Sequence, residues 1–267
     1  MIAVVTIAGG RHAHLSLQLA ALRAVGGPWH VVVAMDDPEL AALCGDAAHV
    51  VGIGRGPDGA LPLAAARNLG AATAIAAGAD LLVFLDVDCV PGPALLRRFG
   101  MVAYAHPGAL ISGPVSYLPP PPRGGYRLAA LRRLAEPHPA RPNPRPDRTV
   151  RLDHDLFWSL SFAVTKEVWA RVGGFDEGYT GYGAEDTDFA QRARAAGVPH
   201  LFVGGAHAYH QWHPTAEPPR QHVADILRNG RRFRERWGRW PMTGWLLEFE
   251  RLGLVVHDRA ADDWRLA

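Results

Sequence analysis

The sequence predicts an α/β fold with a mostly parallel central sheet flanked by helices. Strand-like apolar runs alternate with helix-like segments through the first half of the chain. Leu81–Leu85 contains only apolar residues, as expected of a strand buried on both faces. This run ends in two carboxylates, Asp86 and Asp88, and ligands of open α/β sheets bind beyond the carboxyl ends of the strands.

Composition limits the classes of function that fit this chain. Its 267 residues suffice for one large α/β domain or two small ones, and the formal net charge of +2 argues against a nucleic-acid-binding surface. Cys44 and Cys89 are the only cysteines and imply no disulfide framework. No secretory signal is recognisable, and the longest apolar stretch, around 71–85, is too short to span a bilayer. We therefore expect a soluble, cytoplasmic protein, with peripheral membrane contact left open.

The first half predicts β-α alternation with right-handed crossovers. A Gly/Pro-rich loop is expected over Gly52–Gly59, and Gly78 is a suitable C-cap for the helix before it. The predicted elements are a strand Ile2–Ile7, a helix carrying Leu15, Leu19 and Leu22 on one face, strands Trp29–Met35 and Val50–Ile53, and a helix Leu61–Gly78.

The second half predicts a Pro-rich insertion between ordered segments. Residues 117–150 are expected to be extended and mobile over the site, or else a surface loop without a chemical role. The predicted elements are a helix Pro91–Tyr104, a strand Ala109–Tyr117 interrupted at Gly113, a strand Leu160–Val164, a helix Lys166–Val172, a helix from about Glu185 to Gly197, and two tail helices broken near Gly238–Pro241. The expected domain covers 1–214, with halves 1–115 and 151–214, and 215–267 is a C-terminal helical extension.

Asp86 and Asp88 predict a metal site. Residues i and i+2 of an extended chain point to the same side, so these carboxylates can converge. Hard oxygen ligands suit Mg²⁺ or Mn²⁺ holding a phosphate-bearing substrate. The same triplet recurs at Asp153/Asp155 and Asp186/Asp188, so the position after a buried strand distinguishes the first pair.

Three histidines follow later in the chain at intervals of three, His207, His210 and His213. An extended segment would not aim all three at one point, which favours one histidine joining Asp88 over a three-histidine zinc site. The tail clusters arginines with tryptophans; this pattern fits a membrane surface or a phosphate-bearing acceptor, or an amphipathic helix that packs on the domain.

In this order, the motifs resemble family 2 glycosyltransferases of the GT-A fold, with a C-terminal part similar to the galactosyltransferase-like region. The resemblance covers Ile2 to about Trp245 except the insertion. Gly181–Asp188 is similar to the family motif Trp-Gly-Gly-Glu-Asp-x-Asp, with Tyr182 and Ala184 as departures. The nucleotide contacts that the resemblance implies are Thr6, Arg11, Asp36 or Asp37, Arg67, Asn68 and, near the ribose, Asp86. The implied metal ligands are Asp88 and His210.

The resemblance implies a metal-dependent, inverting transfer of a Gal-, GalNAc- or Glc-like sugar. The donor is a nucleotide diphosphate sugar, UDP-linked by analogy, the metal is Mn²⁺ or Mg²⁺, and the acceptor is a hydroxyl of a glycan, glycolipid or small molecule. Asp186 is the expected general base, and Glu185 is expected to hold an acceptor hydroxyl. Asp188 is interpreted as structural. His207 and His213 are interpreted as packing or loop residues.

Three alternatives stay open at this point. The first is a retaining GT-A sugar transferase acting on a small acid acceptor, and the second is a sugar nucleotidyltransferase, which would release pyrophosphate. The third is a non-catalytic module that binds sugar nucleotides. Gly9-Gly10 is no dinucleotide fingerprint, which argues against a dehydrogenase.

Overall fold

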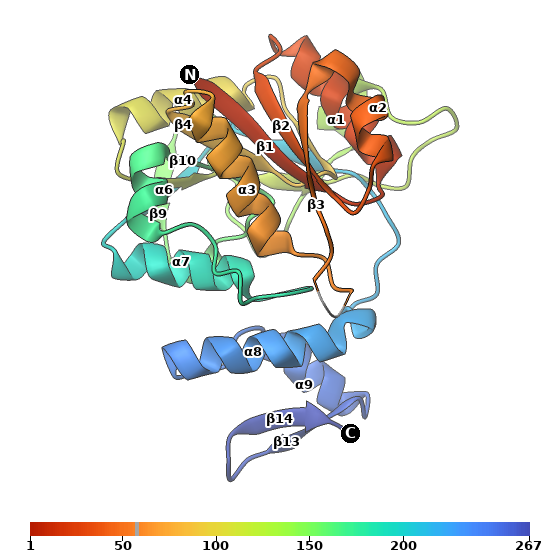
Figure 1. Ribbon diagram of the computed structural model, residues 1–267, viewed down its shortest axis with the longest axis vertical. Coiled ribbons are helices and arrows are strands. Elements are labelled where there is room, and N and C mark those ends of the chain that lie inside the picture. Colours follow the sequence, from red (N-terminus) through yellow and green to blue (C-terminus); the bar gives the residue numbers. More distant parts are fainter. Residues whose placement is uncertain (57–58) are drawn as a thin grey trace.

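The computed structural model describes residues 1–56 and 59–267, and a mixed eight-stranded sheet forms its centre (Figure 1). The strand order is β3-β2-β1-β4-β10-β6-β11-β9, and only β10 and β9 run antiparallel to their neighbours. The prediction of a mostly parallel sheet is therefore confirmed. The strands are β1 (Ile2–Ala8), β2 (Trp29–Met35), β3 (His49–Ile53), β4 (Leu81–Leu85), β6 (Leu110–Ser112), β9 (Thr149–Leu152), β10 (Ser161–Thr165) and β11 (His200–Val203).

Helices cover both faces of this sheet (Figure 1). Strand β4 sends Leu82 and Phe84 into one apolar cluster and Leu81, Val83 and Leu85 into another, which explains its unbroken apolar run. The helices are α1 (His12–Ala24), α2 (Glu39–Cys44), α3 (Leu63–Ala76), α4 (Leu95–Ala105), α6 (Lys166–Val172) and α7 (Glu185–Ala195), with 3₁₀ turns η1 (Gly45–Ala47) and η3 (His154–Leu156).

Two predicted boundaries differ because a second, four-stranded sheet intervenes. It contains β5 (Cys89–Pro91), β12 (Ala208–His210), β7 (Val115–Tyr117) and β8 (Glu136–Pro137), in that order. Helix α4 therefore starts later than expected, after β5. The break expected at Gly113 is real, since β6 and β7 belong to different sheets. A Cβ atom on Gly113 would lie 2.3 Å from the carbonyl oxygen of Ala206, so only glycine fits there. Residues 57 and 58 of the expected Gly/Pro-rich loop lie outside the described residues.

The Pro-rich insertion is packed against the domain, which corrects the expectation of an extended segment. It contains η2 (Leu128–Ala130), α5 (Leu131–Leu134) and β8. Leu131 is buried in a cluster with Val90, Leu118 and Tyr209, and Tyr209 lies on β12. Helix α5 is thereby attached to the small sheet.

The C-terminal extension holds the two expected helices, α8 (Val223–Trp237) and α9 (Thr243–Arg251), after a 3₁₀ turn η4 (Arg220–His222). It also holds a hairpin of β13 (Val255–Asp258) and β14 (Asp263–Leu266), which the expected helical extension did not include. The hairpin was missed because its strands are short and weakly alternating. These elements share an apolar cluster that includes Ile226, Phe249 and Trp264.

The arginines of α8, and Arg239 just after it, are paired with carboxylates of the protein itself. The pairs are Arg228–Asp225, Arg231–Asp263, Arg232–Asp176, Arg234–Asp262, Arg236–Asp176, Arg236–Asp188 and Arg239–Asp155. Such pairing is the behaviour of a helix that packs on its domain. No helix within 1–56 and 59–267 is both long enough and apolar enough to cross a membrane.

Candidate functional site

The loop after β4 is a tight turn, which corrects the expectation of an extended Asp-x-Asp segment. The amide of Cys89 donates a hydrogen bond of 2.8 Å to the carbonyl of Asp86. The turn sends the two carboxylates to different partners. Asp86 contacts Arg67, whereas Asp88 contacts two histidines. One triplet thus supplies two adjoining parts of the site.

Asp88, His210 and His213 form a cluster that could hold a metal ion. The Nε2 atom of His210 lies 3.6 Å from Oδ1 of Asp88, and Nε2 of His213 lies 3.4 Å from Oδ2. One ligand atom from each residue lies within 4.8 Å of the others. Oδ1 of Asp88 is buried and has no hydrogen-bond partner in the described part of the chain. An orphaned carboxylate oxygen beside two imidazoles is a donor set that fits a divalent metal ion.

His213 was expected to be a loop residue, and the structure places it in the metal cluster instead. Strand β12 ends at His210, so the chain is no longer extended when it reaches His213 and can fold back towards Asp88. The spacing of three residues was visible in the sequence, but the end of the strand was not. His207 lies apart from the cluster and stacks loosely on Tyr209, with ring centroids 6.5 Å apart, as expected of a packing residue.

The protonation of this cluster suits a cation. Burial raises the pKa of Asp88, but the hydrogen bond from His213 and the charges of both histidines outweigh it, so the net shift is downward. Burial lowers the pKa of His210 and favours its neutral imidazole, the form that binds metals. Near neutral pH the cluster therefore offers a carboxylate and a neutral imidazole.

A matched pair of histidine variants tests the cluster. His213→Ala should weaken Mn²⁺ binding by about tenfold to a hundredfold because it removes one of three ligand groups. His207→Ala, from the same segment, should leave the affinity unchanged. Isothermal titration calorimetry with Mn²⁺ measures the affinity of both variants. Equal Mn²⁺ affinities for the two variants would contradict the ligand assignment.

Arg67 joins the carboxylates of the turn to those at the start of α7. Its Nη2 lies 3.0 Å from Asp86 and its Nη1 lies 3.2 Å from Glu185, and the side chain is only 4% exposed. Its guanidinium is therefore occupied by protein carboxylates, which is at odds with the expected role as a charge facing the nucleotide. We assign it the role of holding the acidic groups together.

This acidic group has unusual protonation. Burial, aided by the neighbouring charge of Asp88, raises the pKa of Asp86 to about 6 even though Arg67 opposes the shift. Burial also raises the pKa of Asp186, and burial together with the charge of Asp186 raises that of Glu185. Thr187 donates hydrogen bonds to Asp186 through its amide, at 2.7 Å, and its hydroxyl, at 3.3 Å. Titratable groups with shifted pKa values gathered at a sheet edge are typical of active sites.

The remaining predicted nucleotide contacts are dispersed. Thr6 is fully buried, and its hydroxyl bonds Gln18 and His30, which is at odds with a direct nucleotide contact. Gln18 in turn donates to the carbonyls of Asp86 and Cys89 and so supports the turn. Thr6 therefore supports the turn after β4 indirectly, through its hydrogen bond with Gln18.

Asn68 bonds the backbone of Phe175 through both its amide nitrogen, at 2.9 Å, and its oxygen, at 2.8 Å. It secures the turn before α7. Asp37 accepts hydrogen bonds from the amide of Gly10 and from His12, both at 2.8 Å, whereas Asp36 pairs with Arg55 at the surface. Both acids stay at the end of β2, where a nucleobase was expected.

Arg11 occupies the loop between β1 and α1 in a left-handed conformation with φ 59°. Its positive charge acts on Asp88 and His210, so it lies on the metal side of the site. The side chain is exposed. Among the residues described, Arg11 has no ion pair, which leaves its guanidinium available to a ligand.

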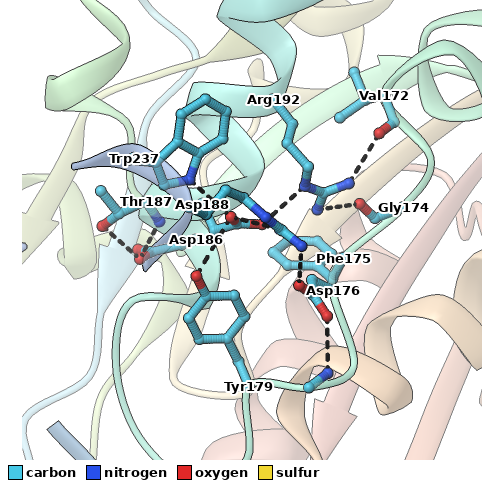
Figure 2. A network of polar contacts seen from close by, with 12 residues as sticks. Val172, Gly174, Phe175, Asp176, Tyr179, Asp186, Thr187, Asp188, Arg192 and Trp237 are labelled. Atoms are coloured by element: carbon cyan, nitrogen blue, oxygen red, sulfur yellow. Dashed lines mark hydrogen bonds and ion pairs between the residues drawn. The ribbon is translucent and has the colours of Figure 1, made fainter. Parts of the chain in front are cut away.

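Asp188 is the structural carboxylate that the sequence predicted, and it anchors α8 to α7. Figure 2 shows Arg192, Trp237 and Tyr179 converging on it. Arg236 adds an ion pair of 2.8 Å, and the Asp188 side chain is fully buried. Asp176, in the turn held by Asn68, binds Arg232 and Arg236 of the same helix. The C-terminal extension is thereby fastened beside the acidic group.

The rival pair Asp153 and Asp155 lies outside this constellation. Asp153 caps η3 and pairs with Arg194, and Asp155 accepts hydrogen bonds from Gln191 and Arg239. Both carboxylates are thus occupied by neighbouring elements, and their role is to fix the start of the second half.

The fold is that of GT-A glycosyltransferases, which confirms the fold prediction. The chain superposes on GalNAc-T7, crystallised with UDP, GalNAc and Mn²⁺, with a TM-score of 0.60 at 14% identity, covering 94% of this chain and 56% of that one. It superposes on residues 1–349 of TarS from S. aureus with a TM-score of 0.57 at 11% identity, covering 87% of this chain and 65% of that one.

Sequence comparisons also find glycosyltransferases, over parts of the chain. A family model described as the N-terminal domain of galactosyltransferase matches residues 146–213. Two validoxylamine A glucosyltransferases, from Streptomyces hygroscopicus subsp. jinggangensis (strain 5008) and subsp. limoneus, are each 31% identical over 157 residues. The match covers 51% of this chain and 36% and 34% of the relatives, so the chain matches about a third of their length. The assignment to family 2 stays a prediction.

Proposed function

We propose that the protein transfers a hexosyl group from a UDP-sugar to an acceptor hydroxyl, with inversion at the anomeric carbon. One observation carries the proposal: the metal-binding cluster of Asp88, His210 and His213 directly adjoins the acidic group of Asp86, Glu185 and Asp186. The relatives add support, since one is named for glucosyl transfer and another was crystallised with UDP and Mn²⁺.

The chemistry follows from where charge develops. Transfer builds positive charge at the anomeric carbon and negative charge on the departing diphosphate. A divalent metal bound by Asp88, His210 and His213 would supply Lewis-acid stabilisation of that negative charge. The exposed guanidinium of Arg11 adds a fixed positive charge on the same side. Asp186 removes the proton from the acceptor hydroxyl while the hydroxyl oxygen attacks the anomeric carbon on the face opposite the diphosphate.

The acidic group also explains how Asp186 can serve as a base. Arg67 neutralises part of the charge of Asp86 and Glu185, so that the ionised form of Asp186 is tolerated beside them. Its raised pKa gives the carboxylate a stronger affinity for a proton than a solvated aspartate has. We assign to Glu185 the orientation of the acceptor hydroxyl.

A thermal-shift panel tests this function. UDP-, ADP- and GDP-sugars are each added with Mn²⁺, with Mg²⁺ or with EDTA. A UDP-sugar at 100 times its Kd should raise the free energy of unfolding by about 2.7 kcal/mol, and only when metal is present. Stabilisation that persists in EDTA, or none with any nucleotide sugar, would contradict the proposal.

Product analysis separates the alternative reactions. Release of UDP supports glycosyl transfer, whereas release of pyrophosphate would indicate a nucleotidyltransferase. Inverted configuration of the product supports Asp186 as the base on the face opposite the leaving group, and retained configuration would overturn that part. Binding without turnover in the presence of a broad acceptor set would indicate a non-catalytic binding module.

A further inference from the structure

A small pocket with a mainly apolar lining lies at the same edge of the main sheet as the turn after β4. Its lining includes Ser112, Arg141, Leu156, Trp158, Ser161 and Phe202. Ser161 opens β10 and pairs in register with Leu85, the residue before Asp86. The amide of Asp86 also donates to the carbonyl of Leu160 at 3.0 Å. The pocket is therefore a direct neighbour of the acidic group.

Two buried polar atoms in this pocket have no partner. Ser161 is 1% exposed, and neither its Oγ nor the buried Nε of Arg141 is hydrogen-bonded within the described chain. Buried polar groups are nearly always hydrogen-bonded, so two orphans in one pocket point to a group that is bound there in use.

Arg141 comes from the Pro-rich insertion, and its guanidinium lies over an aromatic ring. Its guanidinium carbon lies 3.5 Å from the centroid of the Trp158 ring. The rings of His138 and Trp158 pack perpendicular to each other with centroids 4.9 Å apart. The ring of Tyr117 lies between His138 and His210, with centroid distances of 5.5 Å and 4.8 Å. The insertion thus reaches from the metal cluster to the pocket. A guanidinium stacked by its face keeps its in-plane N–H donors for a ligand.

The charge of the pocket selects its ligand. Arg141 donates one hydrogen bond, from Nη1 to the carbonyl of Ala140 at 3.0 Å, and forms no ion pair with any described residue. The pocket residues include no carboxylate. A planar cation with free donors beside a serine hydroxyl matches the geometry of a carboxylate. The space suffices for about one or two water molecules, so a carboxylate group fits and a whole sugar ring does not.

The pocket also adjoins the proposed base. The amide of Ser159, next to Trp158 in the chain, donates a hydrogen bond to Asp186. A ligand whose carboxylate lies on Arg141 would therefore extend its remaining atoms towards the reacting centre.

We propose that this pocket binds a carboxylate carried by one of the two substrates, either an acidic donor sugar of the uronic type or an acidic acceptor. The inference rests on the proposed function and specifies its substrate class. The insertion then acts as the part of the chain that supplies substrate selectivity.

Paired ligands that differ only in a carboxylate test this inference and separate its two sources. Calorimetry in Mn²⁺ compares UDP-glucose with UDP-glucuronic acid in the donor arm, and glucose with glucuronic acid on the UDP-bound protein in the acceptor arm. In one arm the acidic ligand should bind about tenfold or more tightly, the effect of one charge-assisted hydrogen-bonded contact. Arg141→Gln should remove this preference, and Arg133→Gln, at an exposed position of the same insertion, should keep it.

If Arg141→Gln folds poorly, Arg141→Lys and Ser161→Ala test the preference for the acidic ligand independently. Arg141→Lys keeps the charge but loses the planar fork, so it should retain only part of the preference. Ser161→Ala should weaken binding of the acidic ligand and leave the affinity for the neutral ligand unchanged. Equal affinities for both members of each pair, or a preference that survives Arg141→Gln, would overturn the inference. If UDP with Mn²⁺ still binds in that case, the proposed function stands; if UDP does not bind, both fail.

Discussion

Replacing Asp186 by asparagine should lower kcat by roughly 10²–10⁴-fold and leave donor affinity nearly unchanged. Asparagine has the size of aspartate but cannot take up the proton of the acceptor hydroxyl. The metal cluster and the Arg67 pairs do not depend on the Asp186 carboxylate, so the donor should still bind. Release of UDP from the preferred donor, with and without acceptor, measures the change.

Asp153→Asn is the matched control for this variant. Asp153 belongs to the other acidic pair, its side chain is 60% exposed, and it lies outside the acidic group, so kcat should stay close to that of the unchanged protein. Asp88→Asn supplies the opposite reference because it should lose the metal and, with it, transfer. If Asp186→Asn kept near-normal transfer while Asp88→Asn lost it, the base assignment would be wrong.

The pH profile gives a second reading of the same residue. Burial raises the pKa of Asp186 above the ordinary aspartate value of 3.8. Because the base must be ionised, kcat should fall as the pH drops through this raised pKa, and the acid limb should lie above the usual aspartate range. Asp186→Asn should lose this limb together with most of the rate.

Asp188→Asn should lower the free energy of unfolding by about 3–5 kcal/mol, the usual cost of removing one partner from a buried ion pair. The Asp188 side chain is fully buried and binds Arg192 and Arg236 at 2.8 Å each, with Trp237 as a further donor (Figure 2). An amide removes the carboxylate that pairs with Arg192, leaves Arg236 paired with Asp176 alone, and presents an N–H group to existing donors. Urea unfolding measures the change.

Asp155→Asn provides the comparison, because this carboxylate pairs with Arg239 of the same extension but is 47% exposed. Exposed pairs contribute about 0–1 kcal/mol, so the loss should be small. Similar losses for both variants would show that the Asp188 network does not anchor α8. A shift of the unfolding midpoint at unchanged slope would confirm that only stability had changed.

The central sheet could be predicted because its cause is local in the sequence. The apolar run of β4 has to be covered on both faces, and that requirement alone implies helices above and below. The weaker strands escaped notice for the converse reason. β9 and β11 are short and depend on pairing with neighbouring strands, β9 with β11 and β11 also with β6. The C-terminal hairpin depends in the same way on the partner strand.

In the site, residue types were predictable and contacts were not. The sequence indicated the two acids after β4, but a tight turn and the expected extended segment place these carboxylates differently. Arg67 is adjacent to no acid in the chain, and its pairs with Asp86 and Glu185 span 19 and 118 residues. His213 required knowledge of where β12 ends. Long-range contacts of this kind follow from topology, which one sequence encodes only indirectly.

The small sheet has a consequence for metal binding. Strand β12 pairs with β5 so that His210 lies opposite Cys89. The amide of Gln211 donates a hydrogen bond of 2.8 Å to the carbonyl of Asp88. The backbone beneath two ligands is thus fixed before any ion arrives. Binding then costs little conformational entropy. A cation held by Asp88 and His210 would therefore meet a backbone that is already in place, whichever divalent ion it is.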